Sequence, residues 1–311
     1  MKKIIIIAAI IGLGFVLTAC SGSNNGEFDS SKNITVYTRD TSSGTRAGFM
    51  GGIDFKDAAE NDDILVDGFV IRDNTGILTS MSTDEYGIGY ISLASLNNTV
   101  KGLSFEGVEP TLANVISNDY GLKRPFNYVL RSDWTGMETQ KLIAEAFIAF
   151  LATSDGADVI NDKGAISLPT TQTWDDIKDD YTICSQDNSG VVVKFGGSDS
   201  IEKVAKALSE SFAPKCGDFT PEHDHTGSSD GFKRTQGSES SGDSAKHIGF
   251  ASRPFKTDGS EDMETNTAGQ LAWDAIVAIV HLNNTLDNVT AADLKDIYSG
   301  TYTKWDELIV E

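Results

Sequence analysis

Positive charge is scarce in this sequence of 311 residues. Its 25 lysines and arginines stand against 46 aspartates and glutamates, giving a formal net charge of -21. Nucleic acids and anionic membrane surfaces repel such a chain, so we expect neither as an electrostatic partner. A small anion is not excluded, because local dipoles and one or two arginines in a dry cleft outweigh distant charge that salt screens.

Histidine is rare too, with four residues in the whole chain. Two of them stand in the polar segment Glu222-His223-Asp224-His225, where the i, i+2 spacing is weak evidence for a metal site. We expect a solvated loop there, and neither a metal nor a cofactor. The sequence also lacks a G-x-S-x-G elbow and a paired metal-ligand pattern, which argues against a hydrolase.

The longest apolar run lies at the N-terminus, and no other run approaches the length of a membrane span. Lys2 and Lys3 precede an apolar run over residues 4–16, and Leu17-Thr18-Ala19-Cys20 follows. The pattern is typical of a bacterial lipoprotein signal, and the run is short for a membrane helix. We expect a signal peptide over residues 1–19, a lipid on Cys20 and a flexible tether over 20–32, so that an extracytoplasmic protein is anchored to the outer face of the cell membrane.

Cysteine is nearly absent, with three residues in all. After lipidation of Cys20, Cys184 and Cys216 remain. In an oxidising compartment the two could pair, and they could equally stay as free thiols, because sequence does not show their geometry.

The distinctive stretch of the chain is residues 38–46. An apolar alternation over 34–38 predicts a strand, and Arg39 and the turn Ser43-Gly44-Thr45 follow before a helical start. Hydroxyls, free backbone N–H groups and an arginine then gather around one point, which indicates an oxyanion clamp.

Strands followed by Gly-Ser turns recur later in the chain. A strand over 191–195 ends in Gly196-Gly197-Ser198-Asp199-Ser200 before a helix, residues 226–232 form another Gly-Ser turn, and a strand over 248–251 ends at Ser252 and Arg253. The pattern predicts a helix over 138–151 and a strand buried on both faces over 275–282. The sequence therefore predicts an α/β protein.

Nine segments together resemble the phosphate-binding proteins of ABC-type phosphate importers. They are 39–45 (RDTSSGT), 88–92 (IGYIS), 107–111 (GVEPT), 120–125 (YGLKRP), 197–201 (GSDSI), 226–231 (TGSSDG), 248–253 (IGFASR), 275–284 (AIVAIVHLNN) and 294–300 (LKDIYSG) with Trp305. The resemblance implies a two-lobed, periplasmic-binding-protein-like fold of type II, each lobe a mixed, mostly parallel sheet flanked by helices. It also implies a monomer without enzymatic activity that delivers inorganic phosphate to a membrane permease.

The order of these segments departs from the family, because the last two fifths of this chain carry what usually comes first. We therefore expect a circular permutation, which is tolerable when the chain ends lie close together at the surface. The expected lobes are a split lobe of residues 33–96 plus 282–311 and a continuous lobe of residues 97–281.

The resemblance also implies a site between the lobes. One wall is expected to consist of Arg39, Ser43, Gly44 and Thr45. The other is expected to consist of Ser198, Ser200, Ile201, Ser228 and Ser229, with Arg253 nearby. Many family members carry an aspartate in place of Arg253, which accepts the proton of hydrogen phosphate. Asp199 and Asp230 lie beside anion turns, and each could point outward or accept such a proton.

Three alternatives remain open at this level. The chain could bind another oxyanion, such as sulfate, molybdate or a phosphate ester. It could be a secreted hydrolase of phosphate esters. It could also be a surface adhesion or sensor protein that has lost affinity for its ligand.

Overall fold

The structure is a computed structural model that describes residues 28–308. The expected signal peptide, Cys20 and most of the expected tether lie outside the described residues. Residues 28–32 do not form a free tether, since Phe28 is buried with its ring 5.4 Å from Tyr86 and 5.7 Å from Trp305. Among the described residues, no helix has the length and apolar character needed to cross a membrane.

A ten-stranded sheet runs through the whole molecule. Its main path is β2 (Val70–Ile71), β1 (Thr35–Thr38), β3 (Gly87–Ser92), β11 (Ala268–Val280), β6 (Lys123–Leu130), β10 (Ile248–Ala251), β8 (Val192–Gly197) and β9 (Thr220–His225). Two short strands, β4 (Lys101–Gly102) and β7 (Ile166–Ser167), also pair with β11. A separate parallel pair consists of β12 (Asn288–Val289) and β5 (Ser104–Phe105).

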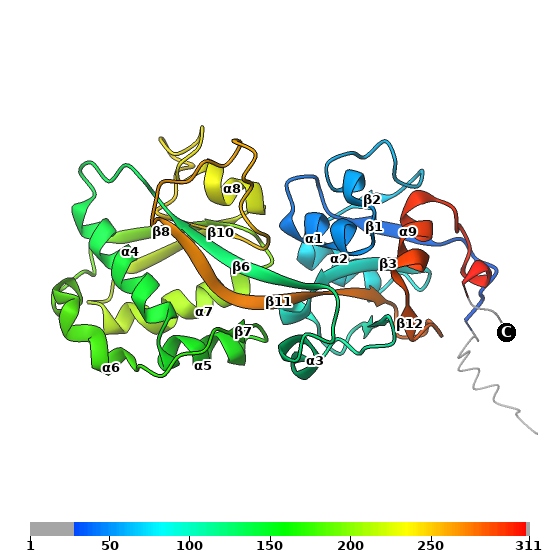
Figure 1. Cartoon of the computed structure of the whole chain (residues 1–311), viewed down its shortest axis with the longest axis horizontal. Coiled ribbons are helices and arrows are strands. Elements are labelled where there is room, and N and C mark those ends of the chain that lie inside the picture. Colours follow the sequence, from blue (N-terminus) through cyan, green and yellow to red (C-terminus); the bar gives the residue numbers. More distant parts are fainter. Residues whose placement is uncertain (1–27, 309–311) are drawn as a thin grey trace, which may run out of the picture.

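Two lobes share the long strand β11, which passes from one to the other (Figure 1). Its first part pairs antiparallel with β6, and its last five residues pair antiparallel with β3. Within the lobes, β1 pairs in parallel with β2 and β3, and β8 pairs in parallel with β9 and β10. The expected two-lobed α/β fold with mixed sheets is confirmed. The expected apolar strand over 275–282 corresponds to the second half of β11, which ends at Val280.

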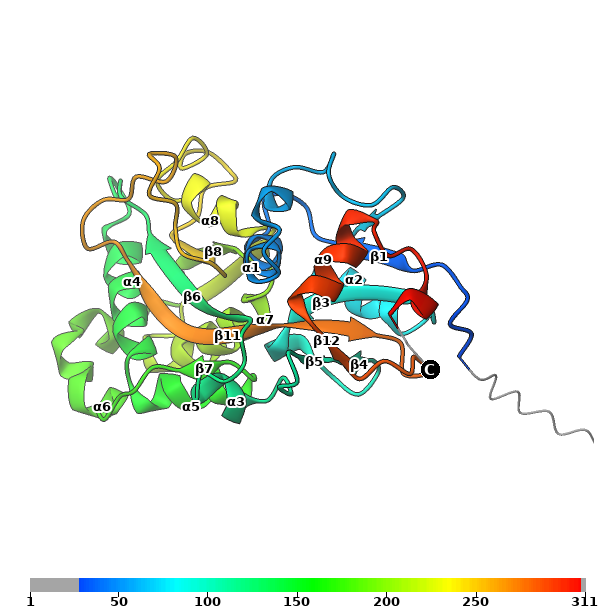
Figure 2. The same ribbon diagram turned by 45° about the vertical axis from the view of Figure 1, so that its right-hand side comes forward.

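Helices cover both lobes. The first lobe carries α1 (Gly44–Gly52), α2 (Asn74–Met81), α3 (Leu112–Ile116) and α9 (Ala291–Ser299). The second carries α4 (Glu138–Leu151), α5 (Ser154–Asp162), α6 (Trp174–Ile177), α7 (Glu202–Phe212) and α8 (Ser228–Lys233). Short 3-10 helices span Lys56–Ala59, Leu93–Ser95, Lys178–Asp180, Thr182–Ser185, Ala213–Lys215 and Trp305–Glu307. Figure 2 shows α9, late in the chain, next to the strands of the N-terminal segment. There the Tyr298 hydroxyl donates to the Tyr37 carbonyl at 2.9 Å.

The chain passes from one hydrophobic core to the other near residues 122–126 and again near residues 272–275. One core contains Leu103, Tyr120 and Leu122 together with residues of β1, β3 and α9, whereas the other begins at Phe126 and ends at Ala272. By packing, the lobes are therefore residues 28–122 plus 275–308 and residues 126–272, except that Ile166 of the second stretch also packs on the first core; residues 123–125 and 273–274 cross between the lobes. Residues 97–122, which we expected in the continuous lobe, pack on the split lobe, because β4 pairs with the end of β11 and β5 pairs with β12.

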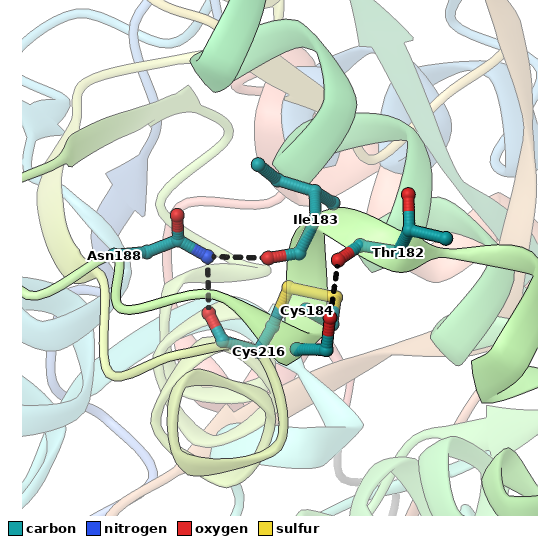
Figure 3. The surroundings of a disulfide bond; sticks show 6 residues. Thr182, Ile183, Cys184, Asn188 and Cys216 are labelled. Atoms are coloured by element: carbon teal, nitrogen blue, oxygen red, sulfur yellow. Dashed lines mark hydrogen bonds between the residues drawn. A yellow bond between two sulfur atoms is a disulfide. The ribbon is translucent and has the colours of Figure 1, made fainter.

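A disulfide joins Cys184 and Cys216, which are 32 residues apart. Figure 3 shows Asn188 beside it, donating to the carbonyls of Ile183 at 2.9 Å and Cys216 at 3.0 Å. The pairing that the sequence left open is thus present. The loop it closes contains β8, the turn after it and α7.

Segment 222–225, which we expected to be a solvated loop, belongs instead to the edge strand β9. It pairs in parallel with β8, and its residues alternate between exposed and half-buried. His223 and His225 are on the half-buried side, where Phe195 and Phe250 stack against them. Three or more metal-ligating side chains do not gather anywhere within residues 28–308.

Candidate functional site

The first wall of the site lies where β1 ends and α1 begins. The Ser43 side chain caps this helix, accepting hydrogen bonds from the amides of Thr45 at 3.2 Å and Arg46 at 3.3 Å. A serine cap of this kind satisfies N–H groups that have no partner within the helix. Gly44 and Thr45 stand at the helix start and are buried, as is Arg39 just after the strand.

The second wall forms from the turns that lead into α7 and α8. Gly197 ends β8 with φ +99°, a conformation that favours glycine, and Ser198 to Ile201 make the turn. Ser198 and Ser200 are buried, and Ile201 is the residue before the first turn of α7. Ser228 begins α8 and is buried as well.

The two walls touch. Thr45 Oγ1 and Ser200 Oγ are 2.6 Å apart, and they belong to different lobes. A Cβ added to Gly44 would stand 2.2 Å from Ser228 Oγ and 2.8 Å from Ser252 Oγ. We use the term cage for the hydroxyls of Thr45, Ser198, Ser200, Ser228 and Ser252 together with the guanidinium groups of Arg39 and Arg124. The lobes are therefore closed around the cage.

Arg39 reaches the cage from the first lobe. Its side chain is fully buried, and Nη1 donates to Thr45 Oγ1 at 3.3 Å. Nη2 donates to both carboxylate oxygens of Asp199, at 2.6 and 2.7 Å. Nε has no hydrogen-bond partner among the described residues. Arg39 thus keeps donor capacity although it already pairs with a carboxylate.

Arg46, which lies near Arg39 in the sequence, has a different role. Nη1 donates to the Arg39 carbonyl at 2.9 Å, and Nε donates to the Ala58 carbonyl at 2.8 Å. It also forms an ion pair with Asp62 at 2.6 Å. Arg46 therefore braces the backbone behind Arg39.

Arg124 is a cage residue that sequence reasoning missed. From β6 its Nη1 donates to Thr45 Oγ1 at 2.8 Å and to Ser252 Oγ at 3.2 Å. Its Nε and Nη2 donate to Asp274 Oδ2 at 3.0 and 2.8 Å. Burial lowers the pKa of Arg124, and the facing Asp274 carboxylate opposes that shift. Segment 120–125 is part of the resemblance, and no local pattern in it indicates that its arginine turns inward.

Ser252 was also missed, whereas its neighbour Arg253 was expected at the ligand. Ser252 is fully buried and accepts a hydrogen bond from Ser198 Oγ at 2.9 Å. Arg253 instead forms a bidentate pair with Glu261, at 2.8 and 2.7 Å, and reaches Ser229 Oγ at 3.2 Å. Ser229 in turn donates to the Ser42 carbonyl across the lobes at 3.3 Å. Ser229 and Arg253 thus form a layer behind the cage.

The two aspartates beside the turns differ in direction. Asp199 points between the lobes, where it also accepts a hydrogen bond from the first amide of α2, Asn74 N, at 3.1 Å. Asp230 accepts a short hydrogen bond from Thr226 Oγ1 and lies 4.0 Å from Arg234. Of these two aspartates, Asp199 is therefore the one placed to influence an anion in the cage.

Hydroxyl and guanidinium donors dominate the cage, and its charges balance. Arg39 faces Asp199 and Arg124 faces Asp274, with all four side chains nearly or fully buried. Converging charge-assisted donors in a water-poor site suit an oxyanion with several acceptor oxygens. Such a site offers little to a cation or an apolar molecule.

Known proteins resemble this chain in both sequence and fold. The profile of the PBP superfamily domain matches residues 171–310. Phosphate-binding protein PstS 2 of Streptococcus pneumoniae (strain TIGR4) is 32% identical over 311 residues, covering 99% of each chain. Phosphate-binding protein PstS 2 of Streptococcus agalactiae (serotype V) is 29% identical over 313 residues, covering 99% of this chain and 98% of the relative. The crystal structure of a phosphate-binding protein of a phosphate ABC transporter from S. pneumoniae superposes with a TM-score of 0.63 at 26% identity, covering 89% of this chain and 100% of that chain.

The alignment with the S. pneumoniae PstS 2 protein runs along 99% of both chains, so the two share one order of segments. The expected circular permutation relative to other members of the family stays a prediction. Identity of this extent over the full length shows common descent. This chain belongs to the PstS family of phosphate-binding proteins.

Proposed function

We propose that this protein is an extracytoplasmic receptor that captures inorganic phosphate in the cage and delivers it to the permease of an ABC-type phosphate importer. It acts as a monomeric binding protein and not as an enzyme. A lipid on Cys20 holds it at the membrane. In this proposal Thr45, Ser200, Ser228, Ser252, Arg39 and Arg124 contact the anion, while Ser43, Ser198, Ser229 and Arg253 hold these groups in place.

The convergence of two buried arginines on one hydroxyl carries the proposal. Arg39 follows β1 and Arg124 belongs to β6, and both donate to Thr45 Oγ1. Asp199 and Asp274 already balance the charges of the two guanidinium groups, so what the arginines offer an oxyanion is a set of converging charge-assisted donors. An oxyanion that entered between them would replace the Thr45 and Ser200 contact and receive donors from both lobes. Hydrolysis is not proposed. Ser209 and His223, 2.8 Å apart, pair a hydroxyl with a base, but Ser209 is fully buried and cannot reach a substrate.

Calorimetric titration of the purified protein with phosphate, arsenate and sulfate tests this function. We expect saturable heat with phosphate and arsenate at micromolar protein, and a much weaker response to sulfate. An absence of heat with phosphate would refute the proposal. Equal responses to phosphate and sulfate would support a receptor for tetrahedral oxyanions in general.

A further inference from the structure

A chain of hydrogen bonds links the two histidines of β9 to the turn that enters the cage. Ser209 Oγ lies 2.8 Å from His223 Nε2, and His223 Nδ1 lies 3.0 Å from His225 Nε2. His225 Nδ1 lies 3.0 Å from the carbonyl oxygen of Ser198. We call this series, from Ser209 to the Ser198 carbonyl, the histidine ladder.

Only one arrangement of protons satisfies the ladder when both rings are neutral. A carbonyl oxygen can only accept, so His225 carries its proton on Nδ1 and leaves Nε2 as an acceptor. His223 must then donate from Nδ1 and accept at Nε2, so the single proton of the Ser209 hydroxyl points to His223 at 2.8 Å and not to the Lys206 carbonyl at 3.0 Å. Burial lowers the pKa of both histidines, to about 3 for His223, which keeps the rings neutral near pH 7. Both histidines are thus Nδ1–H tautomers.

The ladder fixes the peptide group between Ser198 and Asp199. This peptide is planar, so its carbonyl and the N–H of Asp199 point in opposite directions. With the carbonyl held on His225, it cannot turn toward the cage, where it would repel an anion. The same peptide orients Asp199, which meets Arg39, and precedes Ser200, which meets Thr45.

We propose that His225, oriented by His223, is a positioning residue that holds the 198–200 turn in its anion-binding conformation. This inference rests on the proposed function of the cage and assigns a role to a histidine pair outside it. The positioning affects the binding of the phosphate oxyanion. His225 does not touch it, and acts through the Ser198 carbonyl.

Three substitutions at one position separate positioning from packing. The side-chain nitrogen of asparagine can stand near the place of Nδ1, so His225→Asn can keep the bond to Ser198, whereas His225→Gln and His225→Leu cannot keep it in the same geometry. We expect the Kd for phosphate to rise at least tenfold in the Gln and Leu variants and less than threefold in the Asn variant. Equal weakening in all three variants, or no change in any, would overturn the proposal.

His247→Asn is the matched control. His247 is a buried histidine of the same lobe, and its Nδ1 accepts a hydrogen bond from the Lys194 amide at 2.9 Å, away from the 198–200 turn. We expect this variant to bind phosphate as the wild-type protein does. A loss equal to that of His225→Leu would show that any disturbance of the lobe suffices, and would count against a specific role for His225.

Nitrogen-15 NMR of the imidazole rings provides a readout that does not depend on phosphate. At pH 7 both His223 and His225 are expected to show the pattern of a neutral Nδ1–H tautomer. An Nε2–H tautomer at His225 would refute the bond to Ser198 and overturn the inference. If the tautomers are as expected and the wild-type protein gives no heat with phosphate, the proposed function fails and the positioning role for phosphate fails with it, while the ladder itself stands.

Discussion

Arg39 and Asp199 come from opposite lobes and form a buried ion pair, with Nη2 of the arginine 2.6 Å from Oδ1 of the aspartate. Asp199 Oδ2 also accepts the first amide of α2. The Asp199 carboxylate thus accepts hydrogen bonds from donors that could otherwise bind an oxyanion. Any ligand in the cage must share Arg39 with this carboxylate, so the charge and protonation of the ligand matter.

Replacing Asp199 by asparagine is expected to relax discrimination between anions. A carboxylate repels an oxyanion that has no proton, such as sulfate, but accepts a hydrogen bond from protonated phosphate. In Asp199→Asn we expect the ratio of sulfate to phosphate affinity to rise about tenfold, which corresponds to roughly 1.4 kcal/mol. Competitive calorimetry at pH 7 measures the ratio. Asp230→Asn is the control, and an equal change there would rule out a specific effect of Asp199.

Arg124 is expected to be essential for binding. Arg124→Ala removes two cage hydrogen bonds and should weaken phosphate binding by at least about 2 kcal/mol. It also leaves Asp274 buried without its partner, which destabilises the fold. The double variant Arg124→Ala/Asp274→Ala should therefore regain much of the lost stability in urea unfolding without regaining affinity. Recovery of phosphate binding in the double variant would exclude Arg124 from the cage.

Local sequence signals located the turns of the site but not its second arginine. The strand before Arg39 and the Gly-Ser turns near Ser200 and Ser228 could be read from the sequence, because each depends on a few adjacent residues. Arg124 faces Asp274 because the two are directly opposite in the antiparallel pairing of β6 with β11. The register between two strands whose paired residues are 150 positions apart is set by tertiary packing. A local sequence pattern therefore cannot predict this contact.

Two further differences have similar causes. Arg253 follows a cage serine, yet Glu261 turns it away, and a contact made by a later loop is not visible in a strand motif. Segment 222–225 consists of polar and charged residues, which favour a loop. It forms a strand because β8 pairs in parallel with residues 220–225 along six residue pairs.

The disulfide is expected to stabilise the second lobe without affecting the ligand directly. Cys184 and Cys216 lie 32 residues apart, and a cross-link of this span stabilises a domain by about 2 to 4 kcal/mol. The double variant Cys184→Ser/Cys216→Ser should unfold at lower urea concentration by this amount. Its phosphate Kd should stay within about threefold of the wild-type value while folded. A reducing agent should lower the stability of the wild-type protein but not that of the variant.

Acid is expected to destabilise the fold through buried histidines. Burial lowers the pKa of His223 to about 3 and of His247 to about 4, from about 6.5 in the unfolded chain. The unfolded state therefore binds more protons below pH 6.5, and stability present above this pH is lost as the pH falls toward 4. We expect less than about 1 kcal/mol per pH unit from each, because solvent partly screens both rings. Urea unfolding between pH 7 and 5 measures the slope, which His247→Asn should reduce.

Gly44 is expected to control closure of the lobes. An added Cβ would collide with Ser228 and Ser252 of the other lobe, so Gly44→Ala should hold the lobes apart. Because Gly44 stands at the start of α1, alanine costs the helix itself little. We expect phosphate affinity to fall at least tenfold and the radius of gyration in small-angle scattering to increase with phosphate present. Gly51→Ala is the matched control, since an added Cβ in the same helix meets nothing within 4 Å. If Gly44→Ala bound phosphate like Gly51→Ala, closure at this contact would not be required for binding.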